Sequence, residues 1–69
     1  GDVLVSREGN TLRLDNLPSE ATVTVYDAVG HIIEQHSPSQ HLQVNLPTGY
    51  YLLHVANKQN AVVIDTFIP

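Results

Sequence analysis

The stretch "ATVTVYDAVGHIIEQH", residues 21–36, predicts two antiparallel strands joined by a tight turn. Over 21–27, small apolar residues alternate with threonines and Tyr26, and this period of two is typical of a half-buried strand. Gly30 can take a backbone conformation with positive φ that strains other residues. Asp27 can accept hydrogen bonds from backbone amides across the turn. The residues after Gly30 then return as the partner strand.

The same alternation of apolar and polar residues continues on both sides of this hairpin. Short segments rich in Gly, Pro, Asn and Ser separate the alternating stretches, as expected of turns between strands. With the hairpin included, we expect seven strands, at 2–6, 11–15, 21–27, 31–36, 41–46, 50–56 and 61–69. Because no stretch has a useful helical period, the sequence predicts an all-β fold. The expected form is a small antiparallel, immunoglobulin-like β-sandwich, with a small barrel as the alternative closure.

Alternation within the strands also predicts the core. We expect the inner faces to carry Leu12, Leu14, Ala21, Val23, Val25, Leu42, Val44, Leu46, Tyr51, Leu53 and Val55. The terminal strand, 61–69, is apolar on both faces apart from Asp65 and Thr66. We therefore expect it either to be buried on both faces or to form an edge that pairs with another chain, such as a second copy in a homodimer.

Length and composition restrict the classes of protein and partner. The 69 residues are expected to form one domain, 1–69, and they include no cysteine for a disulfide or a thiolate metal site. The formal net charge is −4, and the basic residues Arg7, Arg13 and Lys58 do not cluster, so no nucleic-acid partner is expected. No apolar run approaches the ~20 residues of a membrane span. The chain begins with Gly1, and we expect that an export signal has been removed.

Two motifs and the last strand resemble a known family. The first motif is Val25-Tyr26-Asp27 with Gly30, and the second begins at Leu46 and includes Gly49, Tyr51 and Val55. Together with 61–68, these segments resemble the C-terminal sorting-type modules of the type IX secretion system in Bacteroidetes, and related small secreted domains of unknown function. The resemblance covers residues 12–68. It implies a β-sandwich and a location outside the cell or in the cell envelope.

Four residues of these motifs are expected to have structural roles at turns and corners. Asp27 and Gly30 shape the first hairpin. Tyr51, which follows Gly49, is expected to act like the corner tyrosine of immunoglobulin-like sandwiches, whose hydroxyl bonds to nearby backbone.

The sequence contains no assembled catalytic or metal-binding set. His36 and His41 flank a loop, but two imidazoles supply only half of a structural zinc site. Ser37 and Ser39 lie between them, without the orienting acid and oxyanion hole that a triad needs. We therefore expect no catalytic residues, no metal site, no cofactor and no enzymatic activity.

Tyr26 and Tyr50 are the candidate binding residues. Both are expected to point away from the aliphatic face of their strands, where they would form a patch for a protein or a glycan if they were neighbours. The favoured function is an exported, non-enzymatic binding or accessory module. The alternative is a C-terminal sorting domain of a larger secreted protein. Sorting modules usually end in a short basic tail, whereas no Lys or Arg follows Lys58 here, and this favours the free-standing module.

Overall fold

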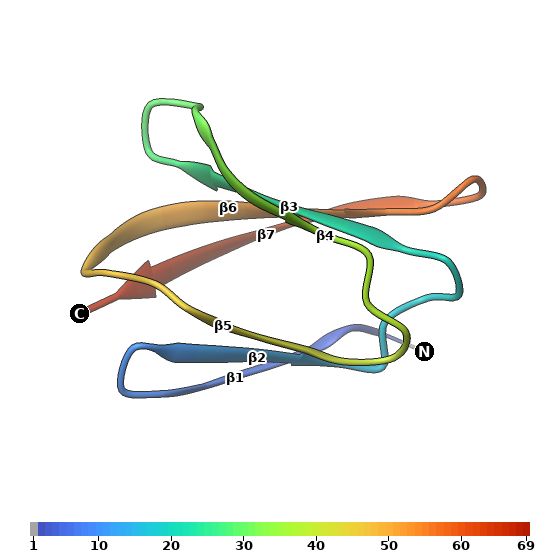
Figure 1. Ribbon diagram of the computed structural model, residues 1–69, viewed down its shortest axis with the longest axis horizontal. Helices are drawn as coiled ribbons and strands as arrows, with labels where there is room; N and C mark the ends of the chain where they lie inside the picture. Colours follow the sequence, from blue (N-terminus) through green and yellow to red (C-terminus); the bar gives the residue numbers. More distant parts are fainter. Residues whose placement is uncertain (1) are drawn as a thin grey trace.

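The computed structural model describes residues 2–69, which form two antiparallel β-sheets packed as two layers (Figure 1). One sheet has the strand order β1-β2-β5 and the other the order β4-β3-β6-β7. The strands are β1 (Leu4–Glu8), β2 (Thr11–Asp15), β3 (Thr22–Asp27), β4 (Ile32–His36), β5 (Leu42–Asn45), β6 (Gly49–Ala56) and β7 (Ala61–Ile68). The prediction of an all-β, seven-strand sandwich is confirmed. The described chain has no helix of the length and apolar character that a membrane crossing requires.

The position of β4 distinguishes this sandwich from the constant-type immunoglobulin order, in which the fourth strand lies beside the fifth. Here β4 pairs with β3, and Tyr26 lies opposite Ile32. The turn between them is closed by two backbone bonds, from the Asp27 amide to the His31 carbonyl at 2.9 Å and from Gly30 to Asp27 at 3.1 Å. So short a connection keeps β4 in the sheet of β3. The chain changes sheets only afterwards, through residues 37–41.

The first strand lies further along the chain than expected. We predicted a strand at 2–6 and a turn at 7–10, but β1 extends to Glu8, and Arg7 lies opposite Leu12. The turn is reduced to Gly9 and Asn10, and Gly9 has a φ of 60°. All five residues of β1 are exposed. Arg7 and Glu8, at the end of β1, therefore remain in contact with water. An exposed edge strand can include such charged residues, although they resemble turn residues in the sequence.

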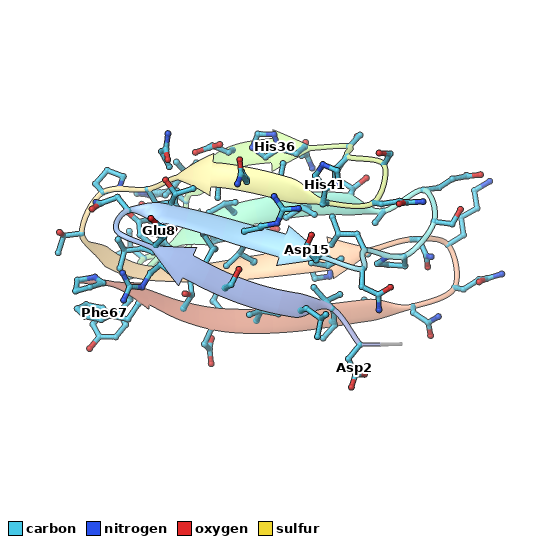
Figure 2. All side chains as sticks on the ribbon, turned by 90° about the horizontal axis from the view of Figure 1, so that it is seen from below. Asp2, Glu8, Asp15, His36, His41 and Phe67 are labelled. Carbon is cyan, nitrogen blue, oxygen red and sulfur yellow. The ribbon has the colours of Figure 1, made fainter. Side chains whose placement is uncertain are left out.

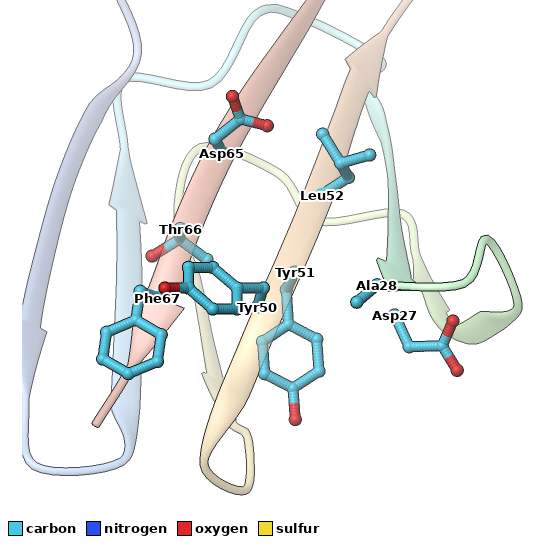
Figure 3. Close-up of a pocket in the computed structure, with 8 residues that line it drawn as sticks. All are labelled: Asp27, Ala28, Tyr50, Tyr51, Leu52, Asp65, Thr66 and Phe67. Atoms are coloured by element: carbon cyan, nitrogen blue, oxygen red, sulfur yellow. The ribbon is translucent and has the colours of Figure 1, made fainter.

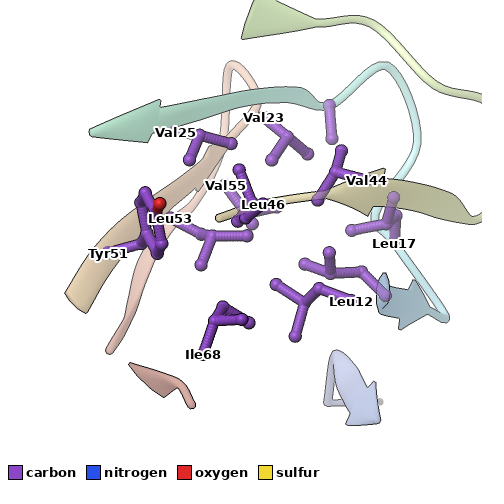
Figure 4. Packing of buried hydrophobic residues seen from close by; sticks show 12 residues of the cluster. Leu12, Leu17, Val23, Val25, Val44, Leu46, Tyr51, Leu53, Val55 and Ile68 are labelled. Carbon is purple, nitrogen blue, oxygen red and sulfur yellow. The ribbon is translucent and has the colours of Figure 1, made fainter. Parts of the chain in front are cut away.

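Among residues 2–69, one cluster of buried side chains fills the space between the sheets (Figure 4). Every predicted inner position belongs to it except Leu42, which is half-buried and packs against it. The cluster also includes Leu17 and Ile68, which the alternation did not single out. The buried residues are Leu12, Leu14, Leu17, Ala21, Val23, Val25, Val44, Leu46, Tyr51, Leu53, Val55 and Ile68.

The terminal strand β7 is an edge, not a strand buried on both faces. It pairs with β6 through a continuous register from Ala61 opposite Ala56 to Ile68 opposite Gly49. Ile68 is fully buried, whereas Val63 and Phe67 are 59% and 47% exposed. Apolar surface on β7 thus remains open to solvent on the outer side of the four-stranded sheet.

Gly30 is expected to be hard to replace, because its φ is 93°. A Gly30→Ala substitution would force a side chain into a backbone region that costs L-residues about 1 kcal/mol or more. In a domain of this size, that loss lowers the Tm by roughly 4–8 °C, which thermal unfolding followed by circular dichroism would measure. The control is Val29→Ala in the same turn. Val29 is 77% exposed, so an equal drop in that variant would contradict the explanation.

Candidate functional site

A groove of about 520 Å³ lies where β6 begins and β7 ends, and it opens on the outer side of the four-stranded sheet (Figure 3). Tyr50 and Leu52 enter it from β6, and Asp65 and Phe67 enter it from β7. These residues point outward because their neighbours Tyr51 and Leu53 point into the core, and strand side chains alternate. The groove is lined by Asp27, Ala28, Tyr50, Tyr51, Leu52, Asp65, Thr66 and Phe67.

An exposed aromatic pair forms one wall of the groove. Tyr50 and Phe67 lie directly opposite each other across the β6–β7 ladder. Their ring centroids are 4.6 Å apart and the rings are tilted by 38°, a separation at which aromatic pairs attract each other. Tyr50 is 67% exposed. The pair therefore presents ring surface to solvent at one end of the molecule, where Figure 2 shows Phe67.

The aromatic neighbour of Tyr50 is Phe67, whereas the sequence analysis suggested a patch of Tyr26 and Tyr50. Tyr26 lies on the same outer face, but its cross-strand neighbours are Leu52 and Ile32, and it does not line the groove. The sequence does contain the information that pairs Phe67 with Tyr50. A hairpin turn at 57–60 places Ala56 opposite Ala61. Counting away from the turn along both strands then brings Tyr50 opposite Phe67.

Asp27 lies between the groove and the β3–β4 turn. Its Oδ1 accepts hydrogen bonds from the backbone amides of Val29, at 3.0 Å, and His31, at 2.9 Å. Its Oδ2 lies 3.3 Å from His31 Nδ1. The amide of His31 is the main cause that lowers the pKa of the Asp27 carboxyl, and the amide of Val29 adds to it. The carboxylate is thereby held in its charged form as part of the turn.

The lowered pKa of Asp27 predicts a dependence of stability on pH. A carboxyl whose pKa is lower in the folded state stabilises the fold fully above the unfolded value, near 3.9. It loses that contribution as the pH falls through the folded pKa. We expect the urea concentration at the unfolding midpoint of the wild-type chain to decrease as the pH is lowered below about 4. The decrease should be smaller in Asp27→Asn. Equal slopes in the two proteins would contradict the assignment.

Asp15 supplies the remaining acid sensitivity expected in that variant. Its pKa is lowered chiefly by the hydrogen bond from Arg13, whose Nε lies 2.8 Å from Asp15 Oδ2. This pair belongs to β2, in the other sheet, so it is unaffected by the Asp27→Asn substitution. The double variant Asp15→Asn, Asp27→Asn should show the smallest change of urea midpoint with pH in the series.

Gly49 and Tyr51 lie at the start of β6, directly after the loop that contains Pro47. The Tyr51 hydroxyl donates a hydrogen bond to the carbonyl of Pro47 at 2.7 Å, while its ring is buried in the core. Gly49 has a φ of 153°. A Cβ at Gly49 would lie 3.6 Å from the Tyr51 hydroxyl oxygen, which is an ordinary contact. Backbone conformation, not lack of space, is therefore what favours glycine at this position.

His36 and His41 lie along one side of the sandwich, on either side of the loop that joins the two sheets (Figure 2). His36 Nε2 is 2.7 Å from Glu34 Oε1. Within residues 2–69, no three His, Cys, Asp or Glu side chains are grouped so that they could hold a metal ion.

The chain is similar to a known protein family and to a curated protein. Residues 7–68 match the family model described as "Secretion system C-terminal sorting domain". The chain is also 32% identical over 65 residues to a probable cytosol aminopeptidase of Clostridium perfringens (strain 13 / Type A). That alignment covers 94% of this chain but 13% of the clostridial protein. The chain therefore spans about an eighth of the length of that relative.

Proposed function

Because the chain belongs to the family of secretion system C-terminal sorting domains, we propose that it is the module that directs export of a longer protein. The family match over residues 7–68 is the observation that carries this proposal. It covers β2 to β7 entirely and the end of β1. Membership of this family also makes the protein a secreted or cell-envelope protein, as the resemblance implied.

The match changes the balance between the two functions considered from the sequence. The absence of basic residues after Lys58 favoured a free-standing binding module over a sorting domain. The family match extends from the end of β1 through β7, so it is carried by the strands of the sandwich. The sorting function is therefore the better supported of the two.

We propose that the module itself is not catalytic. The family description names sorting and no reaction. The activity in the name of the clostridial relative belongs to a whole protein of which the alignment covers 13%, and it is not transferred to this chain. Any enzymatic activity of the longer protein would lie in the cargo that the module accompanies.

A transplantation experiment tests the sorting function. The chain is fused to the C-terminus of a fluorescent reporter that carries an export signal, in a host with a type IX secretion system. We expect the reporter to reach the cell surface or the medium. The same reporter without the chain is the control and should stay in the periplasm. Equal periplasmic retention of both reporters would refute the proposal.

A second candidate function is ligand recognition by the groove, which the exposed Tyr50–Phe67 pair supports. The partner expected from the sequence was a protein or a glycan. Capture from envelope and glycan extracts by the purified chain tests this function. Tyr50→Ala should reduce capture, whereas Tyr26→Ala, on the same face but outside the groove, should not. Equal loss in both variants would mean that the binding surface extends beyond the groove to Tyr26 and would contradict the assignment of the groove as the recognition site.

A further inference from the structure

The free edge of β7 is open to pairing with another strand. Within the described chain, β7 pairs with β6 alone, and its ladder has no register shift from Ala61 to Ile68. The strand has eight residues and contains neither Pro nor Lys, two devices that proteins use to protect a sheet edge. The opposite edge of the same sheet, β4, is shorter and carries an irregularity near Tyr26. Of the two edges of this sheet, β7 is thus the one better suited to strand addition.

The charge of this edge indicates the chemistry of its partner. The outward side chains of β7 are Ala61, Val63, Asp65 and Phe67, of which only Asp65 is charged. The residues that line the groove beside it include Asp65 and no Lys or Arg. Asp27 also lines the groove, but its carboxylate accepts the amide hydrogen bonds of the β3–β4 turn. The ion pairs within residues 2–69 do not involve Asp65. An occupant with a positive charge would complement this surface.

The aromatic pair adds a second attraction for the same charge. Phe67 lies two residues from Asp65 on the same face of β7, next to Tyr50. A strand added to β7 would place one side chain about 5 Å from that of Asp65 and the next outward side chain beside Phe67. A Lys or Arg side chain can contact both a carboxylate and an aromatic face, and each contact is favourable.

We propose that the free edge of β7 binds an extended basic peptide segment of another protein. The backbone of the segment continues the four-stranded sheet, and its Lys or Arg side chains lie against Asp65 and the Tyr50–Phe67 pair. This proposal rests on the groove as the recognition surface and does not depend on sorting. A second copy of the chain fits less well, because β7 has no basic residue and each copy has a net charge of −4.

The test uses peptides that match β7 in length, titrated into the isotopically labelled 69-residue chain and followed by NMR. One peptide alternates valine with lysine, and a second alternates valine with glutamate. A third is the valine–lysine peptide with alternate amides N-methylated, which removes the N–H donors of one strand edge. We expect saturable binding of the first alone, weakened by salt, with the largest shifts in β7 and at Tyr50.

Variants at Asp65 and Phe67 test the contacts. Asp65→Asn should weaken binding of the valine–lysine peptide about two- to fivefold, the range for one cross-strand ion pair. Phe67→Ala should weaken it by a similar factor, about two- to fivefold. Asp65→Lys should weaken it about tenfold or more and make the valine–glutamate peptide the better ligand. Glu8→Lys, on β1 of the other sheet, changes the net charge equally and should leave the affinity unchanged.

Four results of the peptide titrations would overturn the proposal. These are no saturable binding of the valine–lysine peptide, equal binding of its N-methylated form, shifts centred outside β7, and an equal effect of Glu8→Lys and Asp65→Lys. Light scattering that gives the mass of two chains, with a dimer interface at β7, would also overturn it and assign the edge to a second copy. A failed peptide titration would leave the export assay unaffected, so the two proposals can fail separately.

Discussion

A Leu53→Ala variant is expected to be largely unfolded at room temperature. Leu53 is fully buried at the centre of β6, opposite Val25 of β3 and Ile64 of β7. Truncating a buried leucine costs about 2–5 kcal/mol, because the lost apolar contact and the resulting cavity both destabilise the fold. A core in a domain of this size supplies about 3–5 kcal/mol of net stability. One substitution therefore removes most or all of it.

The adjacent residue supplies the matched control for this prediction. Leu52 is on the same strand, but it points outward and is 39% exposed. Leu52→Ala removes the same atoms and should cost less than about 1.5 kcal/mol, because much of the side chain is already in water. Urea unfolding followed by circular dichroism measures both variants. A Leu53→Ala midpoint equal to that of Leu52→Ala would contradict the assignment of the core.

Substitutions at Tyr51 are expected to have the second large effect. Tyr51 is 8% exposed, and its hydroxyl bonds to the Pro47 carbonyl. Tyr51→Ala should cost about 3–5 kcal/mol, as for other buried aromatic residues. Tyr51→Phe keeps the ring and loses one hydrogen bond, so it should cost about 0.5–1.5 kcal/mol. Pro47 is exposed, and water can replace the hydroxyl at its carbonyl.

The difference between the two Tyr51 variants separates packing from the corner bond. Denaturant unfolding of both proteins gives the two free energies. If Tyr51→Phe were as destabilising as Tyr51→Ala, the hydroxyl bond would be the main contribution of this residue, contrary to our account. If Tyr51→Phe had no effect, the bond to Pro47 would be irrelevant to stability.

Alternation along the strands was sufficient to predict the fold class and most of the core. Val23, Val25, Leu53 and Val55 are buried because strands β3 and β6 lie at the centre of their sheet and each has one face on the core. A period of two then assigns every residue to a face. The same logic is why Leu12 and Leu14 were correctly placed.

The pairing of strands could not be predicted in the same way. The position of β4 beside β3 depends on where the chain crosses between sheets, and alternation carries no information about that. The predicted end of β1 was wrong because Arg7 and Glu8 resemble turn residues, whereas an exposed edge strand accepts them. Alternation alone does not show the groove, because the groove also requires the β6–β7 register set by the turn at 57–60, which brings Tyr50 opposite Phe67 and Leu52 opposite Asp65.

The most direct test of the sorting function compares two hosts. The reporter fused to this chain is expressed in a strain with a type IX secretion system and in a strain that lacks it, and the amount of reporter outside the cell is measured in each. We predict export in the first strain and periplasmic retention in the second. The same amount outside both strains, or retention in both, would contradict the conclusion that this sandwich is a sorting module.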